Sequence, residues 1–234
     1  MSECRRGFVP TDEKEFNTES VTLLRRAQKD ILYLLEQGYK INPASTFVGN
    51  HFRLSERQRL AIVRATAVKE VLELREKKRI TRLGASKQVF LDGFNVIITL
   101  EVALSNSTLI HCMDKTIRDL AGLRGTYRII DKTEEAIRLI GEELENLGCE
   151  EAVFYLDAPV SNSGRLKQKL QEELNPFPFQ TRVELVDNAD VILQRLDNVV
   201  TQDAIILNQC DGWINLTAQI ITARLSKLPL VELG

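Results

Sequence analysis

The sequence predicts an α/β protein in two parts: an all-helical N-terminal module, residues 1–86, and an α/β domain, residues 87–234, with a mostly parallel sheet. Up to residue 78, apolar residues recur at helical spacing, whereas from residue 88 onward short apolar runs alternate with helical segments. The charge balance changes at the same place, from 17 Lys and Arg against 11 Asp and Glu to 14 against 22. A basic first part favours a polyanionic partner, although an ordinary solvated helical surface has a similar composition.

The chain has the composition of a folded globular protein, with 234 residues of which 44% are apolar and 27% charged. No apolar stretch reaches the length of a bilayer span, and the charged start lacks the apolar core of a secretion signal. We therefore expect a cytoplasmic protein with no membrane partner. Four scattered cysteines and two histidines argue against a disulfide framework and against a zinc site.

Three helices are predicted in the first part, at residues 17–38, 42–49 and 55–78. The first two end at glycines, and the third begins with Ser55 and Gln58 at the spacing of a capping box. Apolar residues of the third helix form a continuous stripe, made of Leu60, Val63, Ala67, Val71 and Leu74. Such a stripe can pack against the rest of the chain or form a homo-oligomer.

The second part is predicted to alternate strands and helices. Strands are expected at residues 88–92, 109–112, 127–130, 151–157, 182–186, 198–200 and 230–233. Helices are expected after the first strand, from Asp131 to residue 147, at residues 166–174 and 188–197, and after Asp203. Residues 214–225 form an apolar segment to which we assign no element. This alternation is typical of a parallel sheet with helices on both faces.

Four predicted strands are followed, directly or within four residues, by aspartates, and these are the main functional signal of the sequence. The residues concerned are Asp92, Asp157, Asp190 and Asp203. Because the carboxyl ends of parallel strands meet at one edge of a sheet, we expect these carboxylates to converge. Such a cluster requires a cation, and oxygen ligands suit Mg²⁺ or Mn²⁺, which assist phosphodiester hydrolysis by activating water. Asp is also a common cap and turn residue, and we assign that ordinary role to Asp187.

Phosphate binding is predicted for polar residues near these strand ends. Ser161, Ser163 and Arg165 lie at a predicted helix start, where N–H groups, hydroxyls and a guanidinium can hold a phosphate. Simple capping by either serine explains the pattern equally well. Asn95 and Thr201, beside the strand-end aspartates, are the other candidates. The sequence has neither a Gly-Lys-Ser/Thr phosphate loop nor Gly-x-Gly-x-x-Gly, which argues against nucleotide sites built on those loops.

Three segments resemble an uncharacterised prokaryotic family, domain-of-unknown-function family 434. They are AQKDILYLLEQGYKINPASTFVGNHFRLSERQR (27–59), DGFNVIITLE (92–101) and LDAPVSNSGR (156–165). This resemblance extends over most of the chain but implies no activity.

The second part also resembles the PIN-like and NYN-like nuclease superfamily. Asp92 in DGFNVI closes the first strand, Asp190 in ADVILQRL opens a later helix, and Thr201 and Asp203 occur in VVTQDAIIL. The resemblance implies a three-layer α/β/α fold and a ribonuclease that acts on RNA with Mg²⁺ or Mn²⁺ held by these three catalytic aspartates. Asp157 is not part of the usual set. The acid expected on a middle helix is not obvious, and the candidates are Glu101, Asp114 and Asp119.

Two other functions fit the sequence. A non-catalytic nucleic-acid-binding or scaffold protein with a PIN-like fold would account for the missing middle acid. A phosphatase-like hydrolase of small phosphate esters is the second, but Phe94 occupies the position where haloacid dehalogenase chemistry requires a further aspartate after Asp92.

Overall fold

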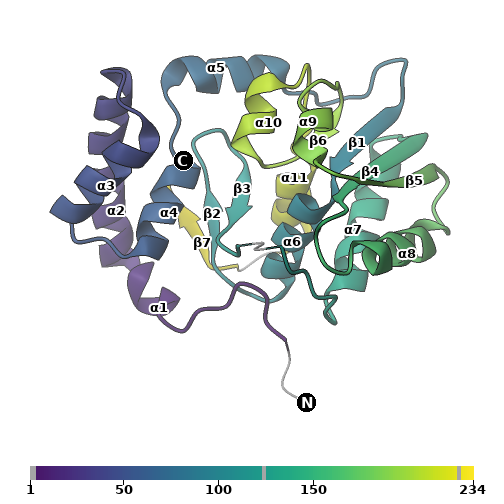
Figure 1. Cartoon of the computed structure of the whole chain (residues 1–234), viewed down its shortest axis with the longest axis horizontal. Coiled ribbons are helices and arrows are strands. Elements are labelled where there is room, and N and C mark those ends of the chain that lie inside the picture. Colours follow the sequence, from purple (N-terminus) through teal and green to yellow (C-terminus); the bar gives the residue numbers. More distant parts are fainter. Residues whose placement is uncertain (1–3, 123–124, 226–227) are drawn as a thin grey trace.

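The computed structural model describes residues 4–122, 125–225 and 228–234. The first part of the chain is helical, as predicted (Figure 1). Its helices are α1 (Asp12–Glu15), α2 (Thr18–Glu36), α3 (Ile41–His51), α4 (Glu56–Ala65) and α5 (Lys69–Lys78). Leu24, Ile31 and Ile62 lie at the centre of the core that joins α2, α3 and α4. None of the described helices is long and apolar enough to cross a membrane.

A four-stranded parallel sheet forms the centre of the second part. Its order is β5 (Gln180–Val186), β4 (Glu151–Asp157), β1 (Gln88–Asp92) and β6 (Val199–Val200). Alternate side chains of each strand enter two separate cores, because successive residues point to opposite faces. Leu91 and Phe154 lie in the core under α6 (Gly93–Leu104), α7 (Thr133–Asn146), α8 (Ser163–Leu174) and α11 (Leu216–Arg224). Phe90 and Tyr155 pack under α9 (Ala189–Leu193) and α10 (Ala204–Gln209).

A second, three-stranded sheet lies between the helical part and the parallel sheet. In it β2 (Leu109–His111) pairs antiparallel with β3 (Ile117–Asp119) and parallel with β7 (Leu230–Glu232). Ile110 and Val231 join the core of α2 to α4, whereas Leu109 and Ile117 join the core of the large sheet. The mixed α/β class and the parallel sheet are confirmed. The expectation that all strands join one sheet is wrong, because this small sheet packs against the helices.

The predicted helix 55–78 is interrupted at residues 66–68 and forms α4 and α5. Its break is stabilised from outside the helix: Met113 donates its N–H to the Ala65 carbonyl (3.0 Å), and the Arg118 guanidinium donates to the Arg64 carbonyl. These bonds satisfy carbonyl groups that a continuing helix would use itself. The predicted continuous apolar stripe is therefore wrong.

The starts of the other predicted helices lie at, or within two residues of, the capping residues that the sequence predicts. Asn17 caps α2 by accepting from the Ser20 N–H (2.8 Å), and Ser55 and Gln58 form the predicted capping box at α4. The helix expected at residue 42 begins at Ile41, and α7 begins at Thr133 without a side-chain cap. Residues 127–130 are not a strand but an irregular segment.

A buried ion cluster around Asp114 connects the two parts of the chain. Arg75 of α5 lies 2.5 Å from Asp114 Oδ2, and Arg118 of β3 donates to the same oxygen. The Thr116 hydroxyl and N–H donate to Oδ1 (2.6 and 3.1 Å). Burial alone would raise the pKa of Asp114, but Arg118, Thr116 and Arg75 outweigh it and lower the pKa overall. Arg75 also donates to Asn208 of α10 (2.8 Å).

We expect Asp114→Ala to lower the free energy of unfolding by about 3–5 kcal/mol, because it leaves two buried guanidinium groups without their counter-charge. Urea denaturation followed by circular dichroism measures this change. Asp30→Ala, on the exposed side of α2, is the control and should shift stability by less than about 0.5 kcal/mol. Equal stability of the two variants would contradict the structural role of the cluster.

Candidate functional site

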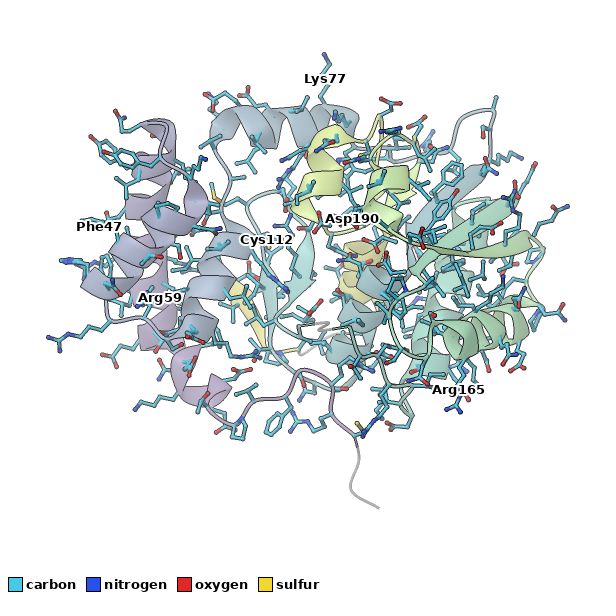
Figure 2. All side chains as sticks on the ribbon, viewed as in Figure 1. Phe47, Arg59, Lys77, Cys112, Arg165 and Asp190 are labelled. Atoms are coloured by element: carbon cyan, nitrogen blue, oxygen red, sulfur yellow. The ribbon has the colours of Figure 1, made fainter. Side chains whose placement is uncertain are left out.

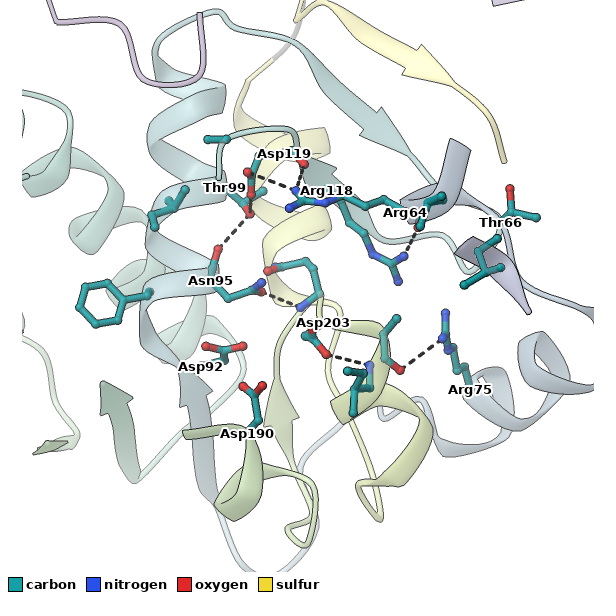
Figure 3. A pocket seen from close by; sticks show the side chains of 18 of the residues that line it. Arg64, Thr66, Arg75, Asp92, Asn95, Thr99, Arg118, Asp119, Asp190 and Asp203 are labelled. Atoms are coloured by element: carbon teal, nitrogen blue, oxygen red, sulfur yellow. Dashed lines mark hydrogen bonds and ion pairs between the residues drawn. The ribbon is translucent and has the colours of Figure 1, made fainter. Parts of the chain in front are cut away.

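The structure brings the four strand-end aspartates into the lining of one cavity of 710 Å³, where Asp92, Asp190 and Asp203 lie near one another (Figure 3). We call this part of the lining the acidic wall. Asp92 ends β1 and Asp157 ends the neighbouring β4. Asp190 lies in the first turn of α9 after β5, and Asp203 caps α10 after β6. All the strands of this sheet are parallel, so their carboxyl ends deliver these residues to the same edge.

Asp92 is the most buried of the four, with 7% of its surface exposed. Its Oδ2 accepts a hydrogen bond from the Thr201 hydroxyl (2.8 Å). Burial raises the pKa of Asp92 to about 7; the Thr201 hydrogen bond opposes this shift, and the charges of Asp190, Asp203 and Asp157 add to it. At neutral pH the free protein therefore holds Asp92 close to half protonated.

Gly93 explains how α6 can begin directly at the end of β1. A Cβ at this position would lie 2.5 Å from the Leu156 side chain and 3.0 Å from the Tyr155 carbonyl oxygen of β4. A larger residue would therefore push α6 away from the sheet and move Asp92 and Asn95 with it. This close contact is the structural reason for the Asp-Gly pair at the strand end.

The other three carboxylates are located at the first turns of α9 and α10. Asp203 and Asp157 accept hydrogen bonds from backbone N–H groups there, and Asp190 is itself a residue of α9. Asp203 Oδ1 accepts from the N–H groups of Ile205 (2.7 Å) and Ile206 (3.2 Å). Asp157 Oδ1 accepts from the Ala189 N–H (2.9 Å), so that it anchors the helix that carries Asp190. Asp157 and Asp203 thus each bind the protein through Oδ1, and their Oδ2 atoms accept no hydrogen bond from the residues that the structure describes. Partial burial and the nearby charges of Asp203 and Asp157 raise the pKa of Asp190.

The opposite wall of the cavity is basic and comes mainly from the helical part. Three arginines line it: Arg64 of α4, Arg75 of α5 and Arg118 of β3 (Figure 3). Apolar side chains lie among the charged ones and are contributed by α2, α3, α4 and α6: Leu35, Ile41, Val63, Phe94 and Ile98. The cavity therefore has one acidic wall and one basic wall, with apolar surface in its lining.

Of the three candidates for a further acid, Asp119 lines this cavity. Its Oδ2 accepts from the Thr99 hydroxyl of α6 (2.8 Å), and its Oδ1 lies 3.6 Å from Arg64 Nη1. Asp114 belongs to the ion cluster described above. Glu101 is fully buried elsewhere in the core, where it accepts from the Tyr127 hydroxyl (2.7 Å) and pairs with Arg6.

The predicted phosphate-binding residues are divided by the structure. Asn95 lines the cavity, and its Oδ1 accepts from the Gln202 N–H (2.8 Å), which leaves its amide hydrogens as donors. Thr201 is 1% exposed and donates to Asp92, while its oxygen accepts from the Asp203 N–H (3.0 Å). Thr201 therefore orients the Asp92 carboxylate and does not face a ligand.

Ser161, Ser163 and Arg165 do not line the cavity. The Ser161 hydroxyl accepts from the Tyr127 N–H (3.2 Å), and the Ser163 hydroxyl donates to the Ala158 carbonyl (3.3 Å). Neither serine caps α8, whose cap residue is Asn162. Arg165 is exposed on the outer side of the molecule, whereas Asp190 faces its middle (Figure 2).

Two arginines of the basic wall, Arg64 and Arg75, were not identified as ligand-binding residues from the sequence. Arg64 and Arg75 belong to a helical segment with several other cationic residues, and nothing in its periodicity separates those that face a cavity from those in solvent. Arg64 lies beside the break between α4 and α5, which hydrogen bonds from a distant hairpin stabilise, whereas Arg75 lies in the last turn of α5.

The acidic wall offers the donor type that Mg²⁺ and Mn²⁺ prefer, since its ligands are carboxylate oxygens. Burial is the main cause of the raised pKa of Asp92, and the negative charges of the other three aspartates, with no described cation beside them, add to the shift. Within the part of the chain that the structure describes, no three Asp, Glu, His or Cys side chains are arranged to hold one ion. Binding therefore requires these carboxylates to rotate toward the ion.

The raised pKa of Asp92 predicts how the metal-free protein responds to pH. The folded-state pKa, about 7, lies above the ordinary value of 3.8 for an aspartate, so between these values the folded state holds a proton that the unfolded state has released. Stability is therefore highest at the acidic end of this window and falls as the pH rises to about 7. Above that pH, this contribution is lost.

We expect the parent protein to lose about 3 kcal/mol relative to Asp92→Asn between about pH 5 and about pH 8, since each unit within the window corresponds to about 1.4 kcal/mol. Urea denaturation of both proteins at a series of pH values measures the difference. Asp30→Asn should keep the parent's slope. Parallel curves for the parent and Asp92→Asn would contradict the raised pKa.

Known proteins resemble this chain in two adjoining segments. Residues 23–78 match the family described as Protein of unknown function (DUF434), which confirms the predicted likeness for the helical part. Segments 92–101 and 156–165, which we had compared with the same family, lie within residues 83–219, and these match a different family.

The uncharacterized protein MJ0935 of Methanocaldococcus jannaschii is 36% identical over 185 residues, which cover 79% of this chain and 88% of that protein. No solved structure matches the chain. The match to residues 83–219 covers more than half of the sequence, and the chain therefore belongs to the family described as Domain of unknown function (DUF5616).

Proposed function

We propose that this protein is a Mg²⁺- or Mn²⁺-dependent nuclease that hydrolyses RNA phosphodiesters in the cavity between its two parts. The observation that carries the proposal is the pairing of a four-carboxylate wall with an arginine wall in one cavity. A polyanionic substrate needs both, because cation-binding carboxylates alone would repel its phosphates and arginines alone would bind it without activating water. The predicted likeness to PIN-like nucleases is in agreement with helices on both faces of a parallel sheet.

Asp92, Asp190 and Asp203 are the proposed catalytic metal ligands, and Asp157 is a fourth candidate at the same edge. A divalent cation held there would lower the pKa of a bound water and offset charge on the scissile phosphate. Asp92 would release its proton when the cation binds, because the cation replaces the counter-charge that the free site lacks. Asn95 would donate from its amide group to a phosphate oxygen.

The residues around these ligands act by positioning them. The Thr201 hydroxyl fixes the orientation of Asp92 through Oδ2, and the first N–H groups of α10 fix Asp203 through Oδ1. Asp157 holds the start of α9 and with it Asp190. These contacts fix the backbone positions of the ligands at one edge of the sheet, so that only their side chains need to rotate toward a cation.

A second candidate function is nucleic-acid binding without catalysis. It is favoured by one observation: among the residues that the structure describes, no three acidic side chains are close enough to hold an ion as they stand. In this case the arginine wall would bind nucleic acid with a steep salt dependence and no requirement for a divalent metal.

Asp92→Asn tests the proposed function. We expect calorimetric titration of Mn²⁺ into the parent protein to show binding that this variant loses, because the substitution removes a ligand charge. Cleavage of a single-stranded RNA in Mn²⁺ should fall by at least about 100-fold, the scale of losing a principal electrostatic group.

Asp187→Asn is the matched control, since Asp187 also follows a strand of the sheet but is exposed and does not line the cavity. This variant should bind Mn²⁺ and cleave RNA as the parent does. A parent protein that binds RNA but neither binds Mn²⁺ nor cleaves would favour the non-catalytic function. Equal cleavage by the parent and Asp92→Asn would show that the assigned site is wrong.

A further inference from the structure

Arg64 makes fewer side-chain hydrogen bonds within the protein than the other two arginines of the cavity and is more exposed. The side chains of Arg75 and Arg118 are 5% and 8% exposed, and both are bound to the buried Asp114 carboxylate. The Arg64 side chain is 32% exposed. Arg75 and Arg118 therefore maintain the wall, and Arg64 is the arginine from which a ligand can receive hydrogen bonds.

The contacts of Arg64 leave most of its guanidinium donors available. Nη1 donates to the carbonyl of Asp119, while Arg118 donates in return to the carbonyl of Arg64, so that the two side chains cross (Figure 3). Arg64 Nε and Nη2 make no hydrogen bond to any described residue. The backbone of Arg64 is thus fixed, and the remaining edge of its fork can bind an anion.

Asp119, the ionic partner of Arg64, is itself incompletely satisfied. It is 6% exposed, yet its Oδ1 accepts no hydrogen bond from the described residues. Arg64 Nη1 lies 3.6 Å from this oxygen, which is longer than a hydrogen bond. Because the pair is not closed, an anion can contact the guanidinium of Arg64 without first breaking a bidentate salt bridge.

The surroundings of Arg64 indicate the class of ligand. Apolar side chains of the helical part, Leu35, Ile41 and Val63, line the cavity together with Arg64, and Phe94 and Ile98 add apolar surface from α6. A free phosphate would leave this surface without contacts. An unpaired nucleotide presents a charged phosphate and an apolar base face together, which is the combination that single-strand binding sites accommodate.

We infer that Arg64 binds a phosphate of a single-stranded polynucleotide next to the phosphate at the acidic wall, so that the helical part completes the site. The identity of the polymer rests on the proposed function, whereas the placement of an anion at Arg64 rests on the contacts above. The inference requires that affinity for a polynucleotide depend on Arg64 even when no metal is present.

The test is fluorescence anisotropy with a labelled single-stranded RNA of about ten nucleotides, in EDTA and over a series of salt concentrations. Arg64→Gln removes the charge but keeps a donor for the Asp119 carbonyl, and it should weaken binding about tenfold. The slope of log Kd against log salt should fall by about 0.7, the value for one phosphate contact with a single strand. Arg64→Lys, which keeps the charge, should keep the parent's salt slope and also serves if Arg64→Gln does not fold.

Arg59→Gln is the matched control, because Arg59 lies on the same helix, donates to the Leu54 carbonyl (3.0 Å) and does not line the cavity. It should bind RNA as the parent does. Selective weakening by Arg64→Gln supports the inference even if the parent never cleaves RNA, since that failure concerns the proposed hydrolysis alone. Equal binding by the parent and Arg64→Gln, an equal loss in both variants, or no binding by the parent would overturn it.

Discussion

The burial of Asp114 between Arg75 and Arg118 is the interaction on which the cavity depends. These three residues come from α5, from the turn after β2 and from β3, and Arg75 reaches on to Asn208 of α10. The two guanidinium groups are accommodated in the interior because Asp114 pairs with both of them and Thr116 satisfies the other carboxylate oxygen. The cluster fixes the distance between the helical part and the parallel sheet, and hence the separation of the two walls.

The two walls of the cavity differ in whether their charges are neutralised within the protein. The basic wall keeps its charges by pairing them internally with Asp114, which lowers that residue's pKa. The acidic wall has no such internal partner: burial, together with the charges of the neighbouring aspartates, raises the pKa of Asp92 to about 7. The acidic wall has no described cation beside it and can bind one. The basic wall faces it, and the guanidinium donors of Arg64 that bind no described residue can bind an anion. A metal-assisted reaction on a polyanion uses both.

Sequence reasoning identified the acidic wall because its signal is local. Short apolar runs that end at Asp92, Asp157 and Asp203 identify parallel strand ends, and parallel strands bring their ends together. The basic wall had no local signal, since the break that divides helix 55–78 depends on bonds from Met113 and Arg118, about fifty residues away in the chain. The same holds for the second sheet, where the C-terminal strand pairs with β2 and not with its neighbours in sequence. The prediction that Ser161 and Ser163 bind phosphate was wrong for a related reason. Hydroxyl residues at a helix start have the same sequence pattern whether they line a cavity or, as Ser161 does, accept a hydrogen bond from the Tyr127 N–H.

Anomalous X-ray scattering from crystals grown with Mn²⁺ would show whether the strand-end carboxylates bind a divalent cation. We expect an anomalous peak at the acidic wall within coordination distance of carboxylate oxygens of Asp92 and Asp203, about 2.0–2.2 Å for such hard-cation ligands. The Asp92 side chain should turn toward the ion while Thr201 still holds Oδ2. Crystals that contain Mn²⁺ elsewhere, with no peak at this wall, would show that these carboxylates are not a cation site.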